Sequence, residues 1–158
     1  MPPPYCYDYP RPAVTVDLAL FALEGDVLQV LMIRRKNDPY AGCWAFPGGF
    51  LEIDEEVETG ARRELAEETG LSVAGPVEFL GVYSAPGRDP RGRTISLAHL
   101  ATLPGSPPPA RGRDDAAEAA WIDVAEIGPL AFDHHAILTD ALHKLGPDHP
   151  RMARFPRG

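Results

Sequence analysis

The most constraining feature of this chain is residues 49–71, which read GFLEIDEEVETGARRELAEETGL. The second half of this segment is rich in Glu, Ala, Arg and Leu, which are good helix formers, and Gly70 is well suited to end a helix. We therefore predict a helix over about residues 55–69, beginning at Asp54 or Thr59. One apolar residue at every fourth position gives this helix a core-facing stripe: Val57, Ala61 and Leu65.

Three glutamates of the predicted helix lie where a solvated acidic face would not place them. At about 100° per residue, Glu64 and Glu68 fall on the apolar stripe and Glu67 flanks it. A carboxylate on the core-facing side is costly unless a cation accompanies it. Oxygen donors at positions i, i+3 and i+4 suit Mg²⁺ or Mn²⁺. We therefore predict that these glutamates bind a divalent metal, against the alternative of an ordinary surface helix.

The spacing of residues 49–71 resembles the Nudix box, G-x5-E-x7-R-E-U-x-E-E-x-G-U with U aliphatic, at every specified position. The resemblance implies metal-assisted hydrolysis of a diphosphate joined to another group, X. It also implies that Arg63 orients the metal-binding glutamates, and that Glu55 ties the preceding loop to the helix. Gly48 and Gly49 would let the backbone turn tightly, and a carbonyl from one of them would assist the metal.

The rest of the chain alternates strand-like runs with turns. Residues 13–34 predict a β-hairpin that turns at Gly25 and Asp26. A second helix is predicted over about residues 134–145, with Asp133 as its N-cap. Further strands are predicted at residues 43–46, 77–83, 94–103 and 120–124.

This order of elements indicates an α/β fold with a mixed sheet between helices. Such a fold is compatible with the α/β/α sandwich that the Nudix resemblance implies. We expect residues 1–12 to form an irregular, proline-rich arm, residues 13–146 to form the single domain, and residues 147–158 to form a C-terminal tail.

Composition and charge narrow the choice of partners. The 158 residues carry a net charge of −8 and no long basic run, so we expect no nucleic acid polymer as a partner. Cys6 and Cys43 lack the spacing of a zinc site or a disulfide framework. The amino-terminal segment lacks the apolar core of a signal peptide, and no apolar run is long enough to cross a membrane. We therefore expect a cytoplasmic protein.

Three stretches outside the box resemble the ADP-ribose pyrophosphatase branch of the Nudix hydrolases: residues 11–50, 87–101 and 131–142. The resemblance implies hydrolysis of ADP-ribose to AMP and ribose 5-phosphate, and it points to a homodimer. To bind the two phosphates and two riboses of ADP-ribose, a site needs cations and hydrogen-bonding groups. The candidate substrate-binding residues, each with a plain surface role as the alternative, are Arg34, Arg35, Glu52, Arg88, Arg91 and Arg93.

A carboxylate must also take a proton from the attacking water. We favour Glu118, in a stretch where related sequences often carry an acid, ahead of Asp115 and Glu67. A surface acid is the alternative for Glu118. His134 and His135 point in different directions on a helix, so we expect them to begin the second helix rather than to share a metal.

Two other functions stay open. The chain could hydrolyse nucleoside triphosphates, oxidised nucleotides or dinucleoside polyphosphates, or it could bind ADP-ribose as a sensor without turnover. The complete set of box glutamates argues against a pure sensor. Related regulators of NAD metabolism add a carboxy-terminal winged-helix domain to their Nudix module. We expect none here, since the chain ends soon after its last predicted helix.

Overall fold

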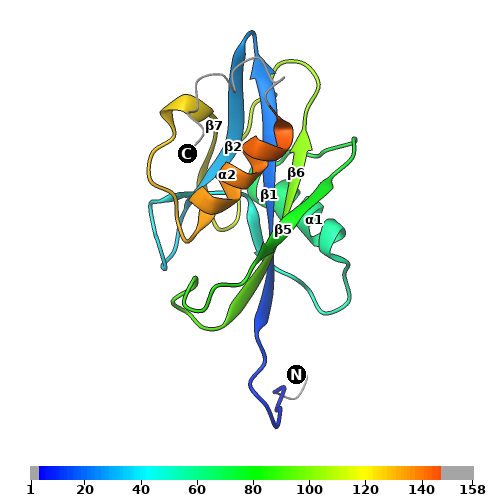
Figure 1. Ribbon diagram of the computed structural model, residues 1–158, viewed down its shortest axis with the longest axis vertical. Coiled ribbons are helices and arrows are strands. Elements are labelled where there is room, and N and C mark those ends of the chain that lie inside the picture. Colours follow the sequence, from blue (N-terminus) through cyan, green and yellow to red (C-terminus); the bar gives the residue numbers. More distant parts are fainter. Residues whose placement is uncertain (1–3, 147–158) are drawn as a thin grey trace.

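In residues 4–146, the part of the chain that this computed structural model describes, seven strands form one mixed sheet (Figure 1). The elements, in chain order, are β1 (Ala13–Glu24), β2 (Val27–Arg35), β3 (Trp44–Ala45), β4 (Gly48–Phe50), α1 (Val57–Thr69), β5 (Glu78–Tyr83), β6 (Thr94–Thr102), β7 (Ala116–Asp123), a short 3₁₀ helix (Val124–Glu126) and α2 (His134–Leu145). In Figure 1, α2 lies in front of the sheet and α1 lies behind it. The predicted α/β fold with a mixed sheet between helices is therefore confirmed.

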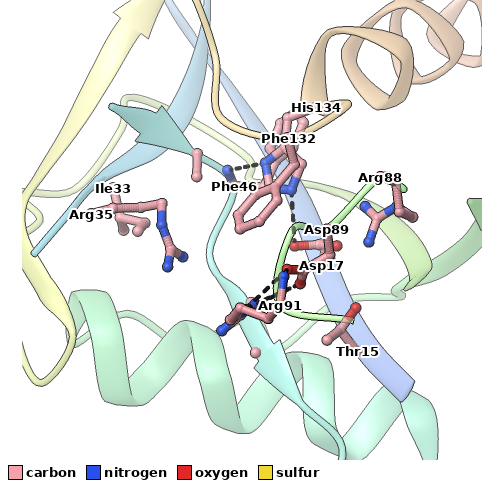
Figure 2. A pocket seen from close by; sticks show the side chains of 13 residues that line it. Thr15, Asp17, Ile33, Arg35, Phe46, Arg88, Asp89, Arg91, Phe132 and His134 are labelled. Atoms are coloured by element: carbon pink, nitrogen blue, oxygen red, sulfur yellow. Dashed lines mark hydrogen bonds and ion pairs between the residues drawn. The ribbon is translucent and has the colours of Figure 1, made fainter. Parts of the chain in front are cut away.

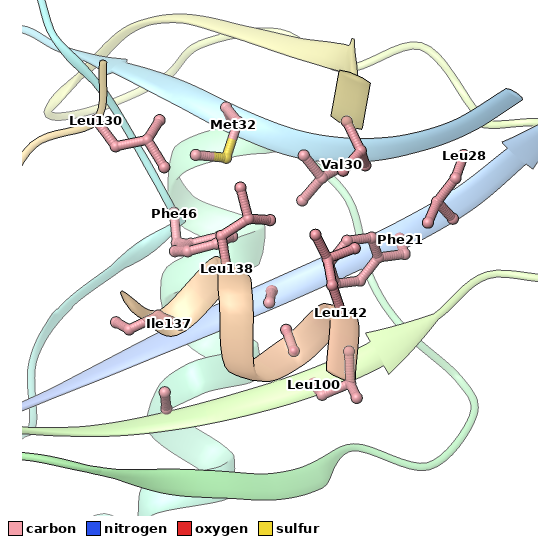
Figure 3. Close-up of a cluster of buried hydrophobic side chains, with 14 residues drawn as sticks. Phe21, Leu28, Val30, Met32, Phe46, Leu100, Leu130, Ile137, Leu138 and Leu142 are labelled. Atoms are coloured by element: carbon pink, nitrogen blue, oxygen red, sulfur yellow. The ribbon is translucent and has the colours of Figure 1, made fainter. Parts of the chain in front are cut away.

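The central strand β1 is buried on both faces, because a helix covers each of them. Ala19 and Phe21 pack with the apolar side of α2 (Figure 3). Leu18 and Leu20 point to the other face and pack with Leu65 of α1. The apolar stripe predicted for the first helix thus faces the sheet, and it carries the neighbouring glutamates towards the sheet as well.

Strands β1 and β2 form the predicted hairpin, but they diverge after pairing from Phe21 to Glu24. Beyond this point β4 pairs with β1, and β3 pairs with β2. Residues 44–50 therefore fill the gap between two diverging strands. On its other side, β1 runs parallel to β6 from Ala13 to Phe21. The gap is important because the segment that fills it leads directly into the box helix.

The predicted start of the first helix is wrong. Helix α1 begins at Val57, and Glu56 lies at the N-cap position without a side-chain capping bond. Neither Asp54 nor Thr59 begins the helix. The carboxylate of Glu55 instead accepts a hydrogen bond from the backbone of Glu52, which organises the chain just before the helix.

Two strand predictions also need correction. Gly48 and Gly49 form a strand rather than a tight turn, because they pair with β1. Strand β7 begins at Ala116 instead of residue 120, because Ala116 already pairs with Arg35 of β2. In both cases the partner strand, rather than the local sequence, determines the extent of the element.

Residues 4–12 contain no helix or strand. The predicted tail at residues 147–158 lies outside the described residues, and the division into arm, domain and tail stays a prediction. No helix in residues 4–146 is long and apolar enough to cross a membrane.

Candidate active site

A hollow of about 510 Å³ opens where α1 meets β4 and the loops that precede β3 and β7. A smaller hollow adjoins it on the side of α2 (Figure 2). The two hollows share Thr15, Arg35, Gly48, Gly49 and Arg91 in their walls. The larger one is lined in addition by Asn37, Asp38, Phe50, Leu51, Glu52, Arg63, Glu64, Glu68 and Asp115.

Of the three predicted metal-binding glutamates, Glu64 and Glu68 line the larger hollow. Glu68 is only 6% exposed, and its Oε2 accepts a hydrogen bond from the backbone N–H of Gly48 at 2.9 Å. Burial, together with the nearby carboxylates of Glu64, Asp17 and Asp115, raises the pKa of Glu68 to about 8, although the hydrogen bond from Gly48 opposes the shift. Burial also raises the pKa of Glu64, although Arg63 opposes that shift. The carboxylates of Glu64 and Glu68 therefore have too little positive charge near them to stabilise their ionised forms.

Glu67, the third predicted ligand, is placed differently. Its side chain is about half exposed, it does not line either hollow, and its Oε2 accepts a hydrogen bond from Arg63 at 3.0 Å. Within residues 4–146, no three acidic, histidine or cysteine side chains converge closely enough to enclose a metal by themselves. Mg²⁺ does not require such a cage, because it keeps several waters and uses one or two carboxylates. The carboxylates of Glu64 and Glu68 thus fit a hydrated divalent cation.

The backbone of β4 closes one side of this carboxylate pair. A Cβ atom on Gly49 would lie 2.5 Å from Oε1 of Glu64, and a Cβ on Gly48 would lie 2.3 Å from the carbonyl oxygen of Val16. Only glycine fits at position 48, where the clash is with backbone, whereas a side chain at position 49 would displace the carboxylate of Glu64. The close approach leaves the main chain of residues 48 and 49 beside the carboxylates, where the predicted carbonyl ligand would have to be.

Arg63 lies at the centre of an acidic cluster. Its guanidinium donates to Glu55 at 2.6 Å, to Glu64 at 2.9 Å and to Glu67 at 3.0 Å. These bonds raise the pKa of Arg63, the largest contribution coming from Glu55. In turn, the hydrogen bonds from Arg63 and from the backbone of Glu52 lower the pKa of Glu55 to about 2. This geometry is what the predicted orienting role of Arg63 and the predicted tying role of Glu55 require.

Two arginines lie in the opposite part of the wall. The Nε of Arg35 donates to the carbonyl of Pro39 at 2.7 Å, and its guanidinium lies 4.9 Å from the ring centre of Phe132. Arg91 forms an ion pair with Asp89 at 2.8 Å and lies 4.9 Å from the ring centre of Phe50. Among the described residues, Arg35 has no carboxylate within ion-pair distance. Burial, and then the charge of Arg91, lower its pKa. Arg35 is therefore the cation of this wall that is best prepared to receive an anion.

The other predicted substrate residues are dispersed. Arg88 lines the smaller hollow, but its guanidinium is bound to Asp133 through two hydrogen bonds of 2.6 and 2.9 Å. Asp133 is at the predicted N-cap position of α2, but its carboxylate makes no capping bond because Arg88 holds it. Arg93 donates to the carbonyl of Ser84 and lines neither hollow. Glu52 does line the larger hollow, 3.8 Å from Arg63.

Glu118, our favoured proton acceptor, lies outside both hollows. It is paired with Arg34 across β2 and β7, with 3.5 Å between Nε and Oε2. Side chains alternate along a strand, so Arg34 points away from the face that Arg35 occupies. Asp115, the next choice, does line the larger hollow and is contacted by the side-chain amide of Asn37 at 3.4 Å.

Sequence reasoning missed several residues of the walls. Phe50 and Phe132 flank Arg91, and nothing in their local sequence distinguishes them from core residues. Asp17 is different, because it interrupts an apolar strand sequence, AVTVDLALF. A charged residue in the middle of a fully buried strand is unusual, and this feature of the sequence was the one that could have identified Asp17 as a residue of the site. His134 does begin α2, as predicted, and its ring also lines the smaller hollow.

Comparison with known proteins assigns the fold and the box to one family. A family model described as the NUDIX domain matches residues 11–145. The chain belongs to the Nudix family. An ADP-ribose pyrophosphatase from Methanocaldococcus jannaschii is 45% identical to it over 132 residues, covering 84% of this chain and 74% of that protein. An ADPR responsive transcriptional repressor from Acinetobacter baylyi is 35% identical and covers 87% of this chain, which spans 56% of the repressor.

Solved Nudix structures superpose well on this one. The NUDIX domain of Shewanella oneidensis NrtR, in complex with ADP ribose, has a TM-score of 0.81 and 31% identity over 88% of this chain and 94% of that chain. A bifunctional NMN adenylyltransferase/ADP ribose pyrophosphatase from Francisella tularensis, in complex with AMP and a manganese ion, has a TM-score of 0.76 and 32% identity over 89% of this chain and 44% of that chain. This Nudix protein is a hydrolase of the family, as its box predicts.

Proposed function

We propose that this Nudix hydrolase cleaves ADP-ribose to AMP and ribose 5-phosphate, with Mg²⁺ or Mn²⁺ as its cofactor. One observation carries the proposal: a single hollow is lined by the carboxylates of Glu64 and Glu68 and by the guanidiniums of Arg35 and Arg91. A diphosphate needs both, because a metal neutralises part of its charge and arginines bind the remainder. The relatives named for ADP-ribose support this choice of substrate.

Glu64 and Glu68 would hold the metal, with Glu67 and a carbonyl of Gly48 or Gly49 as the further predicted ligands. When bound, the metal supplies neutralisation of the diphosphate and lowers the pKa of a bound water. Arg63 orients the carboxylates by bonding Glu64 and Glu67 at the same time. Burial raises the pKa of Glu68, so binding of a metal there would be coupled to loss of its proton.

We place the proton acceptor at Asp115 in preference to Glu118. Asp115 lines the hollow that holds Glu64 and Glu68, whereas Glu118 is paired with Arg34 outside it. Asp115 is the last residue of the loop before β7, and its carboxylate lines the hollow from that side. Because it is exposed, it can exchange the proton with solvent after each turnover.

Arg35 and Arg91 would bind the phosphates and stabilise the charge that develops on them. The rings of Phe50 and Phe132 lie near Arg91, with ring centres 4.9 and 5.7 Å from its guanidinium. A planar base can stack on such a surface, which suits a nucleotide substrate better than inorganic diphosphate.

The test is a substrate panel with Mg²⁺ and with Mn²⁺: ADP-ribose, NADH, diadenosine polyphosphates, nucleoside triphosphates and 8-oxo-dGTP, with products separated by chromatography. We expect AMP and ribose 5-phosphate from ADP-ribose at the highest kcat/KM. A preference for a triphosphate would contradict the assignment of the substrate but keep the box chemistry. Tight ADP-ribose binding by calorimetry without product would favour the ADP-ribose-binding sensor.

A homodimer and a cytoplasmic location stay predictions. Three tyrosines of the amino-terminal arm are largely exposed: Tyr5, Tyr7 and Tyr9. Exposed aromatic side chains on an extended arm suit packing on a second copy. Light scattering coupled to gel filtration measures the mass directly, and a monomer at micromolar concentration would contradict the proposed dimer.

A further inference from the structure

A buried polar chain runs behind the metal-facing carboxylates, on the α2 side of the sheet. Ser96 of β6 donates a hydrogen bond to Oδ2 of Asp17 on β1. The other oxygen, Oδ1, lies 3.5 Å from Nε2 of His134, at the start of α2 (Figure 2). All three residues are at least 94% buried. The chain therefore joins three elements within the core.

The same chain ends on the main chain of the segment that fills the gap between β1 and β2. The backbone N–H of Phe46 donates to Nδ1 of His134 at 3.0 Å (Figure 2). Because Nδ1 accepts, the ring proton of neutral His134 lies on Nε2 and faces Asp17. Asp17 also pairs with Gly48 in the β1–β4 register, and a Cβ on Gly48 would lie 2.5 Å from its Oδ1. On the α2 side, Phe46 is thus hydrogen-bonded to His134, and Gly48 is closely approached by Asp17.

On the opposite side, Gly48 is bonded to the metal-facing helix. Its N–H donates to Oε2 of Glu68 at 2.9 Å. A continuous series of contacts therefore leads from Ser96 and Asp17, through His134 and the segment at residues 46–48, to the carboxylate of Glu68. The segment between the two sides has little other freedom, because the carbonyl of Pro47 accepts from the backbone of Leu18 at 2.9 Å.

Stability alone does not explain this chain. A buried carboxylate carries a large desolvation cost, and replacing buried charged groups by well-packed apolar residues is often neutral or stabilising. Asp17 is followed on the same face of β1 by the apolar Ala19 and Phe21, so an apolar residue at position 17 would extend that apolar face. What an apolar residue cannot do is fix the ring orientation of His134, and through it the backbone of Phe46.

We propose that Ser96, Asp17 and His134 are positioning residues for the metal site: they hold residues 46–48 so that the N–H of Gly48 keeps Glu68 aimed into the hollow. This inference rests on the proposed metal-dependent function. Partners that orient metal ligands typically change metal affinity or activity by about 10–100-fold when they are removed. Among the described residues, Arg35 and Arg91 form no hydrogen bond or ion pair with Ser96, Asp17 or His134, so metal affinity and kcat should change more than the KM for ADP-ribose.

Three substitutions at one position separate the two contacts of His134. His134→Ala removes both. His134→Asn keeps an acceptor where Nδ1 was, for the N–H of Phe46, whereas His134→Gln keeps a donor where Nε2 was, for Asp17. The matched control is Leu142→Ala, which removes a buried side chain from the far end of α2 without touching the polar chain. All four proteins, the wild type and Glu68→Gln are compared.

The probe is Mn²⁺ alone, titrated into the metal-free protein and followed by electron paramagnetic resonance, together with the thermal midpoint and steady-state kinetics. We expect His134→Gln and His134→Ala to weaken Mn²⁺ binding about tenfold or more, and His134→Asn to recover most of it. Leu142→Ala should lower the thermal midpoint and leave Mn²⁺ binding unchanged. If His134→Ala does not fold, the comparison of His134→Asn with His134→Gln still tests the positioning role of His134.

Three results would contradict the inference, and they differ in what else they contradict. If Leu142→Ala weakens Mn²⁺ binding as much as His134→Gln does, the effect is a general loss of stability. If Glu68→Gln weakens Mn²⁺ binding but none of the His134 variants does, the polar chain does not position the site, and the proposed function is unaffected. A wild-type protein that binds no Mn²⁺ would contradict the proposed metal-dependent function and this inference together.

Discussion

The backbone N–H of Gly48 donates to the buried carboxylate of Glu68 at 2.9 Å, which joins strand β4 to the side of helix α1 that carries the predicted metal-binding glutamates. This one bond joins the residue just before the first glycine of the box to a glutamate near its end. The box is thus held closed, its start beside its end. Its chemistry depends on a carboxylate that would be unfavourable in this position without a cation.

Replacing Glu68 by Gln should abolish most of the activity while the fold is kept. The amide has nearly the same shape and can still accept from Gly48, but it cannot supply the negative charge that a divalent cation needs. We expect kcat for ADP-ribose to fall by at least about 100-fold. Circular dichroism should show an unchanged fold. Near wild-type turnover in this variant would contradict the assignment of the metal site.

Arg35 and Arg34 are adjacent in the chain and form a matched pair. Of the two, only Arg35 lines the hollow, and no carboxylate of residues 4–146 lies within ion-pair distance of it. Arg35→Ala should raise the KM for ADP-ribose by about 10–100-fold, the value of one or two charge-assisted hydrogen bonds. Arg34→Ala removes an exposed ion pair with Glu118 and should change the kinetics by less than about twofold. Equal effects of the two substitutions would show that the phosphates bind elsewhere.

Asp115 and Glu118 provide a second matched comparison. Loss of a general base lowers kcat by about 10²–10⁴-fold, so Asp115→Asn should reduce kcat strongly with little effect on Mn²⁺ binding. Glu118→Gln, outside the hollow, should retain kcat. The pH–rate profile of each variant gives a further criterion, because the acidic limb should change only in Asp115→Asn. The reverse result would restore Glu118 as the proton acceptor.

The ion pair of Glu55 with Arg63 predicts a specific acid sensitivity. The folded-state pKa of Glu55 is lowered to about 2, first by its hydrogen bonds from Arg63. A lowered pKa stabilises the fold above the unfolded-state value of about 4.3. This contribution is lost as the pH falls from there towards 2. We expect the difference in the free energy of unfolding between wild type and Glu55→Gln to be largest near pH 7 and to vanish near pH 2, as measured by urea denaturation. A difference that is constant with pH would show that the charge of Glu55 contributes nothing.

Some features of this protein could be derived from the sequence alone, because they depend on local periodicity. The helical spacing of Val57, Ala61 and Leu65 placed α1 on the sheet, and the same spacing placed Glu64 and Glu68 beside the core. The alternation in residues 13–34 predicted the hairpin. The spacing of the box identified the family without any knowledge of the fold.

Other features depended on contacts between distant residues, which periodicity does not contain. Strand β4 exists because β1 is available to pair with it, and the start of β7 is set by Arg35 on β2. The separation of Arg35 from Arg34 follows from which face of the sheet each side chain reaches. Asp115 is separated from Glu118 because it lies in the loop before β7, whereas Glu118 lies within that strand. The chain Ser96–Asp17–His134 joins residues up to 117 positions apart, where 134 − 17 = 117. The sequence by itself determined the chemistry of the box helix, and only the tertiary structure decided which distant side chains share its hollow, because that depends on strand pairing and not on spacing along the chain.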